Sequence, residues 1–326
     1  MAHRAGVHVS TVSRALSSPE GPVPGVGAEV VHRVRAIAVE LGYRPDPNAA
    51  SLRTRRTKVI AVLVPRLSDV VLATIFEGVE DHLTARGYQA VVASTGDDPA
   101  ERRRRLDLLL SRRIDGVIIG DAHLSDPSLS ETAVPFVLVN RSVPGQVSAT
   151  CADEEGGRLV GAHFAARGHR RVGIAGGFPW ASTATRRAHG CRTVLAEHGT
   201  PVPDDYVVRS GFDVDSGRRA ADVLLDLSPR PTAVFAVNDH TALGVMGAMR
   251  DRGLVPGRDI AVVGFNDIDA ARELTIPLSS VDSSPRRMGG TAAELLLARL
   301  NGREVRSVEL EPALRIRASS LTSPGG

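Results

Sequence analysis

The stretch AVFAVNDHTALGVMGAMRDR, residues 233–252, decides the fold class. Its first five residues are continuously apolar, Asn238 and Asp239 follow at once, and a helical pattern begins at 239. A short apolar run that leads directly into a helix is typical of a strand buried on both faces of a parallel sheet. The stretch therefore predicts an α/β architecture.

The same alternation extends outward over the chain from Lys58 onward. Strands are predicted at 59–64, 88–94, 116–120 and 136–140, and a second set at 171–177, 206–210, 233–239 and 260–267. Helical patterns lie between most of them, for example at 100–112, 154–167, 215–227, 239–252 and 285–300. Two such sets predict two doubly wound parallel sheets, one in each of two lobes, with a ligand cleft beyond the carboxyl ends of the strands.

Amide side chains stand at three of these strand ends: Asn140, Asn238 and Asn266. An amide both donates and accepts hydrogen bonds, which suits a ligand that carries several hydroxyl groups. The alternative for Asn238 and Asn266 is that they only cap the helices that follow the strands.

The first 58 residues have a different character. They hold nine Lys or Arg and four Asp or Glu, a net charge of +5, while the whole chain carries +3 and the remainder therefore −2. A basic head on a mildly acidic body indicates a polyanionic partner, although a solvated basic surface would give the same numbers.

Two amphipathic helices are predicted in this head. In AGVHVSTVSRAL, residues 5–16, Val9, Val12 and Leu16 form the expected inner face. Ser10, Thr11, Ser13 and Arg14 are expected on the outer side. A second stripe over 30–41 ends at Gly42 and consists of Val30, Val34, Ile37, Ala38 and Leu41. Pro45 and Pro47 then open a linker that is too short to form a stable helix without a partner.

Several functional classes are disfavoured. No apolar run approaches the roughly 20 residues that span a bilayer, and no signal peptide is recognisable, so the chain is expected in the cytoplasm. Nucleotide-binding, hydrolase and metalloprotease motifs are absent, which predicts neither an enzyme nor a cofactor. Cys151 and Cys191 are expected to be free and buried, and His163 and His169 to be structural. The acidic run 153–155 is expected to complement a helix dipole.

The whole chain resembles the LacI/GalR family of bacterial transcriptional repressors. The head stretch 5–16 resembles the family's helix-turn-helix, and LGYRPDPNAASLR, residues 41–53, resembles its hinge. Further similar segments follow in family order: VIAVLVP (59–65), SRRIDGVIIG (111–120), VPFVLVNR (134–141), RGHRRVGIAGG (167–177), 230–254 and DIAVVGFNDI (259–268).

The resemblance implies a homodimer that binds operator DNA and a small effector, with no metal and no membrane association. The fold class is a small all-α helix-turn-helix head plus an α/β two-lobed body like a periplasmic binding protein. The expected boundaries are 1–44 for an N-terminally truncated head, 45–57 for the hinge and 58–326 for the body. The expected N-lobe covers 58–153 and 283–312, and the C-lobe covers 154–282 and 313–326.

Site residues follow from the same resemblance. DNA contacts are expected from Val9, Ser10, Thr11, Ser13 and Arg14 in the head and from Ala49, Leu52 and Arg53 in the hinge. Leu52 would insert into the minor groove as an apolar wedge, and Ala49 would pack on the partner's hinge. The effector is expected to contact Asn140, Arg187, Phe212, Asn238 and Asn266. These are amides, an arginine and an aromatic face, a combination suited to a sugar.

The chain departs from the family pattern at several positions. His8 replaces the usual serine cap, a change expected to cost about 1 kcal/mol. Val31 and Ala50 replace arginines, which predicts lost phosphate contacts. The segment 65–76 lacks the usual aromatic residues near Asp69 to Leu72, and Asn266 replaces an aspartate, which predicts a less anionic pocket. Two alternatives stay open: an effector sensor with a defective head, and a ligand-capture protein that does not bind DNA.

Overall fold

The computed structural model describes residues 1–17, 23–43 and 56–321. The chain forms two compact units, residues 1–58 and 59–326. The predicted hinge contacts Ala49, Leu52 and Arg53, and the departure at Ala50, lie outside the described residues.

The first unit is a small all-α head. Its helices are α1 (Ala2–Ala5), α2 (Val9–Ser17) and α3 (Ala28–Glu40). Gly6 ends α1 with φ 64°, a left-handed conformation that glycine adopts without strain. The head core contains Ala5, Val12, Ala15, Val23, Val31 and Val34. Val9 is 68% exposed and Leu41 46% exposed, so their assignment to inner faces was wrong.

The first sheet of the second unit is entirely parallel, with strand order β11-β5-β4-β3-β1-β2. The strands are β1 (Val59–Val64), β2 (Gln89–Ser94), β3 (Gly116–Ile119), β4 (Phe136–Val139), β5 (Ser148–Cys151) and β11 (Val308–Leu310). β1 lies one strand in from the edge and pairs with β2 and β3 at once, with Ile60 opposite Ala90 and Gly116, and all its residues after Val59 are buried. Its helices are α5 (Val70–Thr84), α6 (Pro99–Ser111) and α12 (Pro285–Leu300), with the 3-10 helix η1 (Pro127–Glu131).

The second sheet repeats this order as β12-β10-β9-β8-β6-β7. Its strands are β6 (Val172–Ala175), β7 (Val207–Val208), β8 (Ala233–Ala236), β9 (Ala261–Asn266), β10 (Ser279–Asp282) and β12 (Ala313–Arg315). The last pair, β10 with β12, is antiparallel, while the other neighbours are parallel. The helices are α7 (Asp153–Ala166), α8 (Ser182–Glu197), α9 (Val214–Asp226), α10 (Asp239–Asp251) and α11 (Asp269–Arg272), with the 3-10 helices η2 (Asp204–Tyr206) and η3 (Ala318–Ser320).

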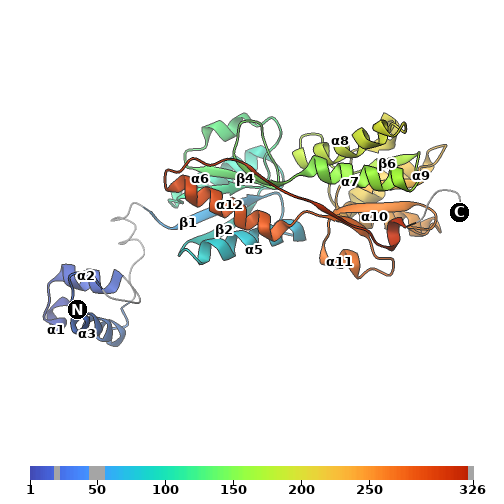
Figure 1. The fold of residues 1–326 in the computed structure, drawn as a ribbon. Coiled ribbons are helices and arrows are strands. Elements are labelled where there is room, and N and C mark those ends of the chain that lie inside the picture. The colour runs from blue at the N-terminus through green and yellow to red at the C-terminus, as the bar shows by residue number, and fades with distance from the viewer. Residues whose placement is uncertain (18–22, 44–55, 322–326) are drawn as a thin grey trace. The chain divides into compact units, whose positions relative to one another are not determined.

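Figure 1 shows the two sheets as two lobes of the second unit, with the chain passing between them after β5, β10 and β11. The lobe built on the first sheet is called the N-lobe below, and the other the C-lobe. Both lobes have the strand order of doubly wound folds, in which ligands bind beyond the carboxyl ends of the strands. The fold therefore places two such edges in one unit.

Glycines allow the helices of each lobe to pack at very short distances. A Cβ on Gly190 of α8 would lie 1.9 Å from the Glu154 carbonyl oxygen of α7, and one on Gly157 would lie 2.0 Å from that of Arg187. The pair α5–α12 is built in the same way, since a Cβ on Gly289 would lie 1.9 Å from the Ile75 carbonyl. These close contacts set the position of α8 against α7.

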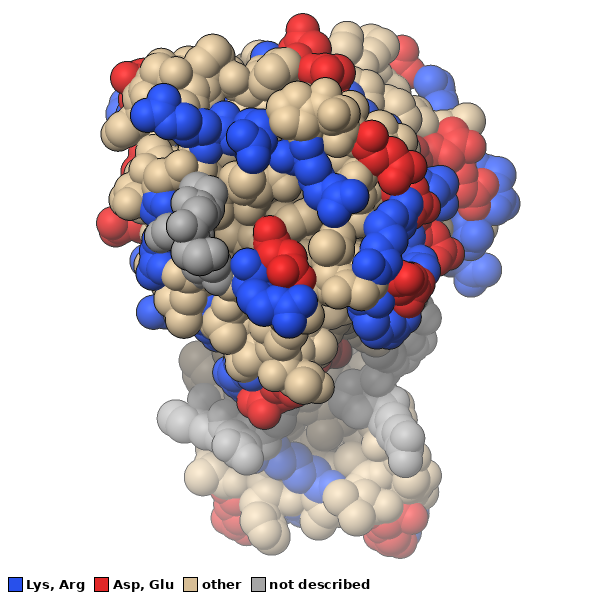
Figure 2. Space-filling model, turned by 90° about the vertical axis from the view of Figure 1, so that its right-hand side faces the viewer, with Lys and Arg blue, Asp and Glu red and all other residues tan. Residues whose placement is uncertain are grey.

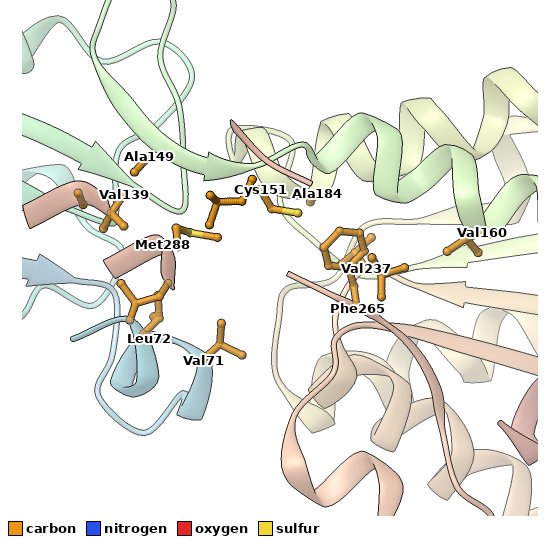
Figure 3. Packing of buried hydrophobic residues seen from close by; sticks show 14 of the residues in the cluster. Val71, Leu72, Val139, Ala149, Cys151, Val160, Ala184, Val237, Phe265 and Met288 are labelled. Atoms are coloured by element: carbon orange, nitrogen blue, oxygen red, sulfur yellow. The ribbon is translucent and has the colours of Figure 1, made fainter. Parts of the chain in front are cut away.

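One hydrophobic cluster runs through both lobes. Figure 3 shows Leu72, Val139 and Met288 on the N-lobe side and Val237 and Phe265 on the C-lobe side. The C-lobe end drawn nearest the viewer in Figure 2 has Lys and Arg side chains interspersed with Asp and Glu. Among the described helices, none combines the length and apolar character that a membrane crossing requires.

Candidate functional site

A cleft of about 170 Å³ lies between the lobes of the second unit, at the carboxyl ends of strands from both sheets. The N-lobe lines it with Pro65, Arg66, Ser68, Asp69, Val71, Leu72, Asp97, Asn140 and Arg141. The C-lobe lines it with Phe178, Thr183, Arg187, Phe212, Asp213, Val214, Asn238, His240 and Asn266. The structure thus brings all five residues expected at the effector site, from five separate segments, into one lining.

Arg187 is the most firmly held of these side chains. It is 3% exposed; its Nε donates to Asp153 Oδ1 at 2.7 Å and its Nη1 to the Val237 carbonyl at 2.8 Å. Its guanidinium carbon lies 3.7 Å from the centre of the Phe265 ring, a cation–π contact. Within the described residues its Nη2 makes no hydrogen bond, and Arg187 lines the cleft. Both N–H groups of Nη2 therefore remain for a ligand, while Nε and Nη1 fix the side chain.

Asp153 is the charge partner of Arg187. It lies with Glu154 and Glu155 in the first turn of α7, as expected for acids that complement the helix dipole, but it is 1% exposed and also pairs with Arg187. Burial raises the pKa of this carboxyl, and the charge and hydrogen bond of Arg187 oppose that rise. Nothing in the run of three acids indicated which of them is buried against an arginine.

The three asparagines differ in what they already bind. Asn238 caps α10: its Oδ1 accepts from the Thr241 N–H and its Nδ2 donates to the Phe212 carbonyl, both at 2.8 Å. Asn266 caps no helix; its Oδ1 accepts from the Ser283 hydroxyl at 3.1 Å. Asn140 adopts φ 65° directly after β4, and its side chain makes no hydrogen bond within the described residues. Asn238 is therefore a helix cap, and only one of its two amide hydrogens remains for a ligand.

The aromatic surface comes from the C-lobe. The rings of Phe178 and Phe212 meet edge to face with centres 5.7 Å apart, and Trp180 stacks on Phe178 at 4.4 Å. The guanidinium carbon of Arg141 lies 5.6 Å from the Phe212 ring centre. The stretch around Asp69 to Leu72 contributes no ring, so Phe178 supplies the second aromatic wall that sequence reasoning missed.

Charged groups line the cleft in pairs. Arg141 donates from both terminal nitrogens to the Asp97 carboxylate, at 2.5 and 2.9 Å, and the two side chains are nearly buried. Burial would raise the pKa of Asp97, but the hydrogen bonds and charge of Arg141 outweigh it and lower that pKa. Asp97, Asp69 and Asp213 make the lining richer in carboxylates than the substitution at Asn266 predicted. A search of polar residues behind every strand end would have found Asp97, because it follows β2.

Two of these pairs join the lobes at the cleft. Arg66 of the N-lobe lies 3.4 Å from Asp213 of the C-lobe, and Asp69 lies 3.8 Å from His240. Asp69 and Asp213 also cap α5 and α9, accepting from the N–H groups of Val71 and Ser216. The cross-lobe pairs therefore sit on helix starts whose positions are fixed.

The buried histidines and cysteines have structural surroundings. His163 bonds to Ser320 through Nε2, and His169 to Thr232 through Nδ1. Cys151 and Cys191 are buried free thiols, and burial raises the pKa of each to about 12. Within residues 1–17, 23–43 and 56–321, no three His, Cys, Asp or Glu side chains are grouped so as to hold a metal ion.

In the head, the side chains of Val9, Ser10, Ser13 and Arg14 are exposed and Thr11 is half-buried. The expected loss of the α2 cap at His8 is wrong. The His8 Nδ1 accepts from the Ser10 N–H at 3.3 Å and lies 2.8 Å from the Ser10 hydroxyl, so this side chain caps the helix. Val31 is 5% exposed in the head core, so a lost phosphate contact is the wrong interpretation of that position. Arg33 ties the helices together by donating to the Ala5 carbonyl at 3.2 Å.

Comparison with known proteins gives the same two-part division. Residues 1–46 match the model for bacterial regulatory proteins of the lacI family, and residues 162–320 match a periplasmic binding protein-like domain. The chain is 31% identical to the HTH-type transcriptional repressor PurR of Pasteurella multocida over 98% of this chain and 97% of that one.

Solved structures are similar over the whole length. A complex of the transcriptional regulator CelR with cellobiose shares 30% identity, 98% coverage of both chains and a TM-score of 0.74. The Lac repressor dimer bound to operator and the anti-inducer ONPF shares 26% identity, 98% coverage of this chain and 97% of that one, and a TM-score of 0.86.

A helix-turn-helix head joined to a two-lobed binding body with a polar cleft defines a ligand-controlled DNA-binding protein. The chain belongs to the lacI family of bacterial regulatory proteins. It is a DNA-binding repressor with an effector-binding domain, and its family is not one of enzymes.

Proposed function

We propose that this repressor acts as a cytoplasmic homodimer whose affinity for operator DNA is controlled by a small uncharged polar effector, a sugar or sugar derivative, bound in the cleft. The expected effector contacts are Asn140, Arg187, Phe212, Asn238 and Asn266. The expected DNA contacts are Val9, Ser10, Thr11, Ser13 and Arg14, together with Ala49, Leu52 and Arg53. The domain boundaries at 44 and 57 belong to the same proposal.

The pairing of charges in the cleft is the observation that supports an uncharged effector. Each of its three arginines, Arg66, Arg141 and Arg187, already has an aspartate within 3.4 Å. An anionic effector would have to compete with those carboxylates, and a cationic one with the guanidinium groups. A polyol needs no net charge and uses single donors and acceptors, such as the free Nη2 of Arg187 and the Asn140 amide.

The aromatic faces support a sugar in particular. Phe212 and Phe178 offer apolar ring surface beside amide groups, which is the combination that fits the apolar and hydroxyl-bearing sides of a pyranose or furanose. The similar CelR structure is a complex with cellobiose.

Control of DNA binding requires that the effector bind two states of the protein with different affinity. The cleft has the geometry for this because its walls come from two lobes, bridged by Arg66–Asp213 and Asp69–His240. In the proposal, a ligand that changes the distance between the lobes acts through the hinge, residues 45–57, on the operator affinity of the head.

The test is binding of the full chain to DNA from upstream of its own gene, measured by gel shift with and without a panel of sugars. Trp180 is the only tryptophan and stacks on Phe178, so its fluorescence reports effector binding separately. A saturating effector at about 100 times its Kd adds about 2.7 kcal/mol to stability, which a thermal-shift screen detects.

Two variants separate the two sites. Arg14→Ala should abolish the gel shift and leave the fluorescence titration unchanged, because Arg14 belongs to the other unit. Asn140→Ala should weaken the effector and leave effector-free DNA binding unchanged. A chain that binds sugars but shifts no DNA would contradict the operator proposal, and one that binds only charged ligands would contradict the effector class.

A further inference from the structure

A second cavity of about 200 Å³ lies in the C-lobe between α8 and the edge strand β7. Helix α8 serves both sites: Thr183 and Arg187 face the cleft, while Ala184, Ala188 and Arg192, each at a helical spacing of four, line the cavity. Phe178 lines both. The family resemblance and the proposed function leave this cavity without a role.

The cavity has an apolar interior and a basic rim. Its interior is formed by Ile174, Phe178, Ala184, Ala188 and Val207, and its rim by His189, Arg192 and Arg209. Arg209 is exposed and makes no side-chain hydrogen bond or ion pair within the described residues. The lining thus combines an apolar set of side chains with three that carry nitrogen.

Arg192 already has a carboxylate partner at this rim. Its Nη2 donates to Asp204 Oδ1 at 2.8 Å and to the Val202 carbonyl at 3.2 Å, and the Asp204 side chain is 91% exposed. Glu154 lies 3.8 Å from His189, the same distance as that between Asp69 and His240 in the cleft. Arg209 differs from the arginines of the cleft, because each of those is paired with a carboxylate and Arg209, among the described residues, is not.

We propose that this cavity is a second ligand site, specific for a small organic anion with a compact apolar body. The carboxylate or phosphate of that ligand would bind Arg209 and the remaining donors of Arg192, and its body would lie against Ile174, Val207 and Phe178. Because the Phe178 ring is shared with the cleft, an occupant also changes the environment of Trp180, which stacks on that ring. The site is independent of the identity of the effector.

Benzoate and phenyl phosphate are suitable probes, and benzyl alcohol is their uncharged counterpart. The full chain should bind one or both anions saturably in calorimetry, with a change in Trp180 fluorescence, and benzyl alcohol much more weakly. Benzoate alone would assign a carboxylate ligand, and phenyl phosphate alone a phosphate monoester; either supports the site. If neither anion binds saturably, or if benzyl alcohol binds equally well, the proposal is wrong.

Variants locate the binding. Arg209→Gln should weaken the anion about tenfold, the effect expected from losing one charge-assisted hydrogen bond. Arg170→Gln removes the same charge from an exposed position outside both cavities and should have no effect. Ala188→Leu, which fills the interior, should abolish binding with Arg209 intact. If Arg170→Gln weakened anion binding as much as Arg209→Gln, the proposal would be overturned. The same holds if only Arg66→Gln, a change in the cleft, weakened anion binding, because the anion would then bind elsewhere.

Discussion

The two walls of the cleft each contain an arginine–aspartate pair, but the pairs are held differently. On the C-lobe wall Arg187 is fixed by Asp153, by the Val237 carbonyl and by the Phe265 ring, all inside the lobe. On the N-lobe wall Arg141 holds Asp97, whose side chain is 11% exposed and also lies 3.5 Å from His123.

The difference separates a rigid wall from an adjustable one. Arg187 keeps its position in the cleft whatever the N-lobe does, because its partners belong to its own lobe. The exposed Arg66 has its ion-pair partner across the cleft, in Asp213, and Asp69, which also caps α5 within the N-lobe, lies 3.8 Å from His240. On this view the C-lobe wall orients a ligand, and the N-lobe wall responds to how closely the lobes approach.

The largest expected effect comes from breaking the rigid pair. Arg187→Met leaves the Asp153 carboxylate buried without its cation, and should lower the free energy of unfolding by about 3–5 kcal/mol. Arg141→Met should cost clearly less, because Asp97 is closer to water and keeps His123. Urea denaturation of both variants, followed by circular dichroism, measures this. An equal or larger loss for Arg141→Met would remove the distinction between the walls.

A second substitution tests what places Arg187 beside Asp153. Gly190→Ala puts a Cβ 1.9 Å from the Glu154 carbonyl, so α7 and α8 must separate, and should cost about 1–3 kcal/mol of unfolding free energy. Gly290→Ala in α12 is the matched control, since its Cβ would meet only Gly78 O at 3.6 Å. The control should be neutral or stabilising by about 0.5–1 kcal/mol, because alanine favours helix. Destabilisation by both would mean that helix contacts are not the cause.

The sequence predicted some strands and residues of the cleft walls and missed others, for physical reasons. The apolar runs 59–64 and 260–267 predicted their strands to within one residue, and the asparagines at the ends of β4, β8 and β9 all line the cleft. The short strands SATC, SSVD, VEL and ALR at β5, β10, β11 and β12 were missed. Three or four residues with mixed polarity carry no periodic signal, and tertiary pairing alone makes them strands.

The arginine–aspartate pairs of the cleft walls could not be predicted from the sequence either. Nothing in the acidic run 153–155 distinguishes Asp153 from its neighbours until α7 crosses α8 and places it under Arg187. Likewise Asp97 and Arg141 lie 44 residues apart, and only the order of β2, β1, β3 and β4 brings their loops together. Motif resemblance located single residues, whereas the electrostatic character of the cleft depends on pairs.

The walls should also respond to pH with opposite signs. Burial raises the pKa of Asp239, at the start of α10 behind the C-lobe wall, to about 7, above its unfolded value, so its contribution to stability is lost as pH rises from about 4 to 7. The lowered pKa of Asp97 gives stability that is present above its unfolded pKa and lost on acidification. Asp239→Asn should therefore be less stable than wild type at pH 5. At pH 8 its free energy of unfolding, relative to that of wild type, should be higher by at least about 1.4 kcal/mol than at pH 5. A pH-independent difference from wild type would contradict the burial of a titrating carboxyl there.

The smallest expected effect is at the cross-lobe pair Arg66–Asp213. The side chains are 53% and 46% exposed and 3.4 Å apart, so a double-mutant cycle with Arg66→Gln and Asp213→Asn should give a coupling of only about 0.2–1 kcal/mol in unfolding. Asparagine retains the α9 cap that Asp213 provides, which isolates the charge. The same cycle measured on effector affinity should give a larger coupling, because the pair joins the two lobes whose approach the proposed effector controls. Equal coupling in both measurements would show that the N-lobe wall is as rigid as its counterpart.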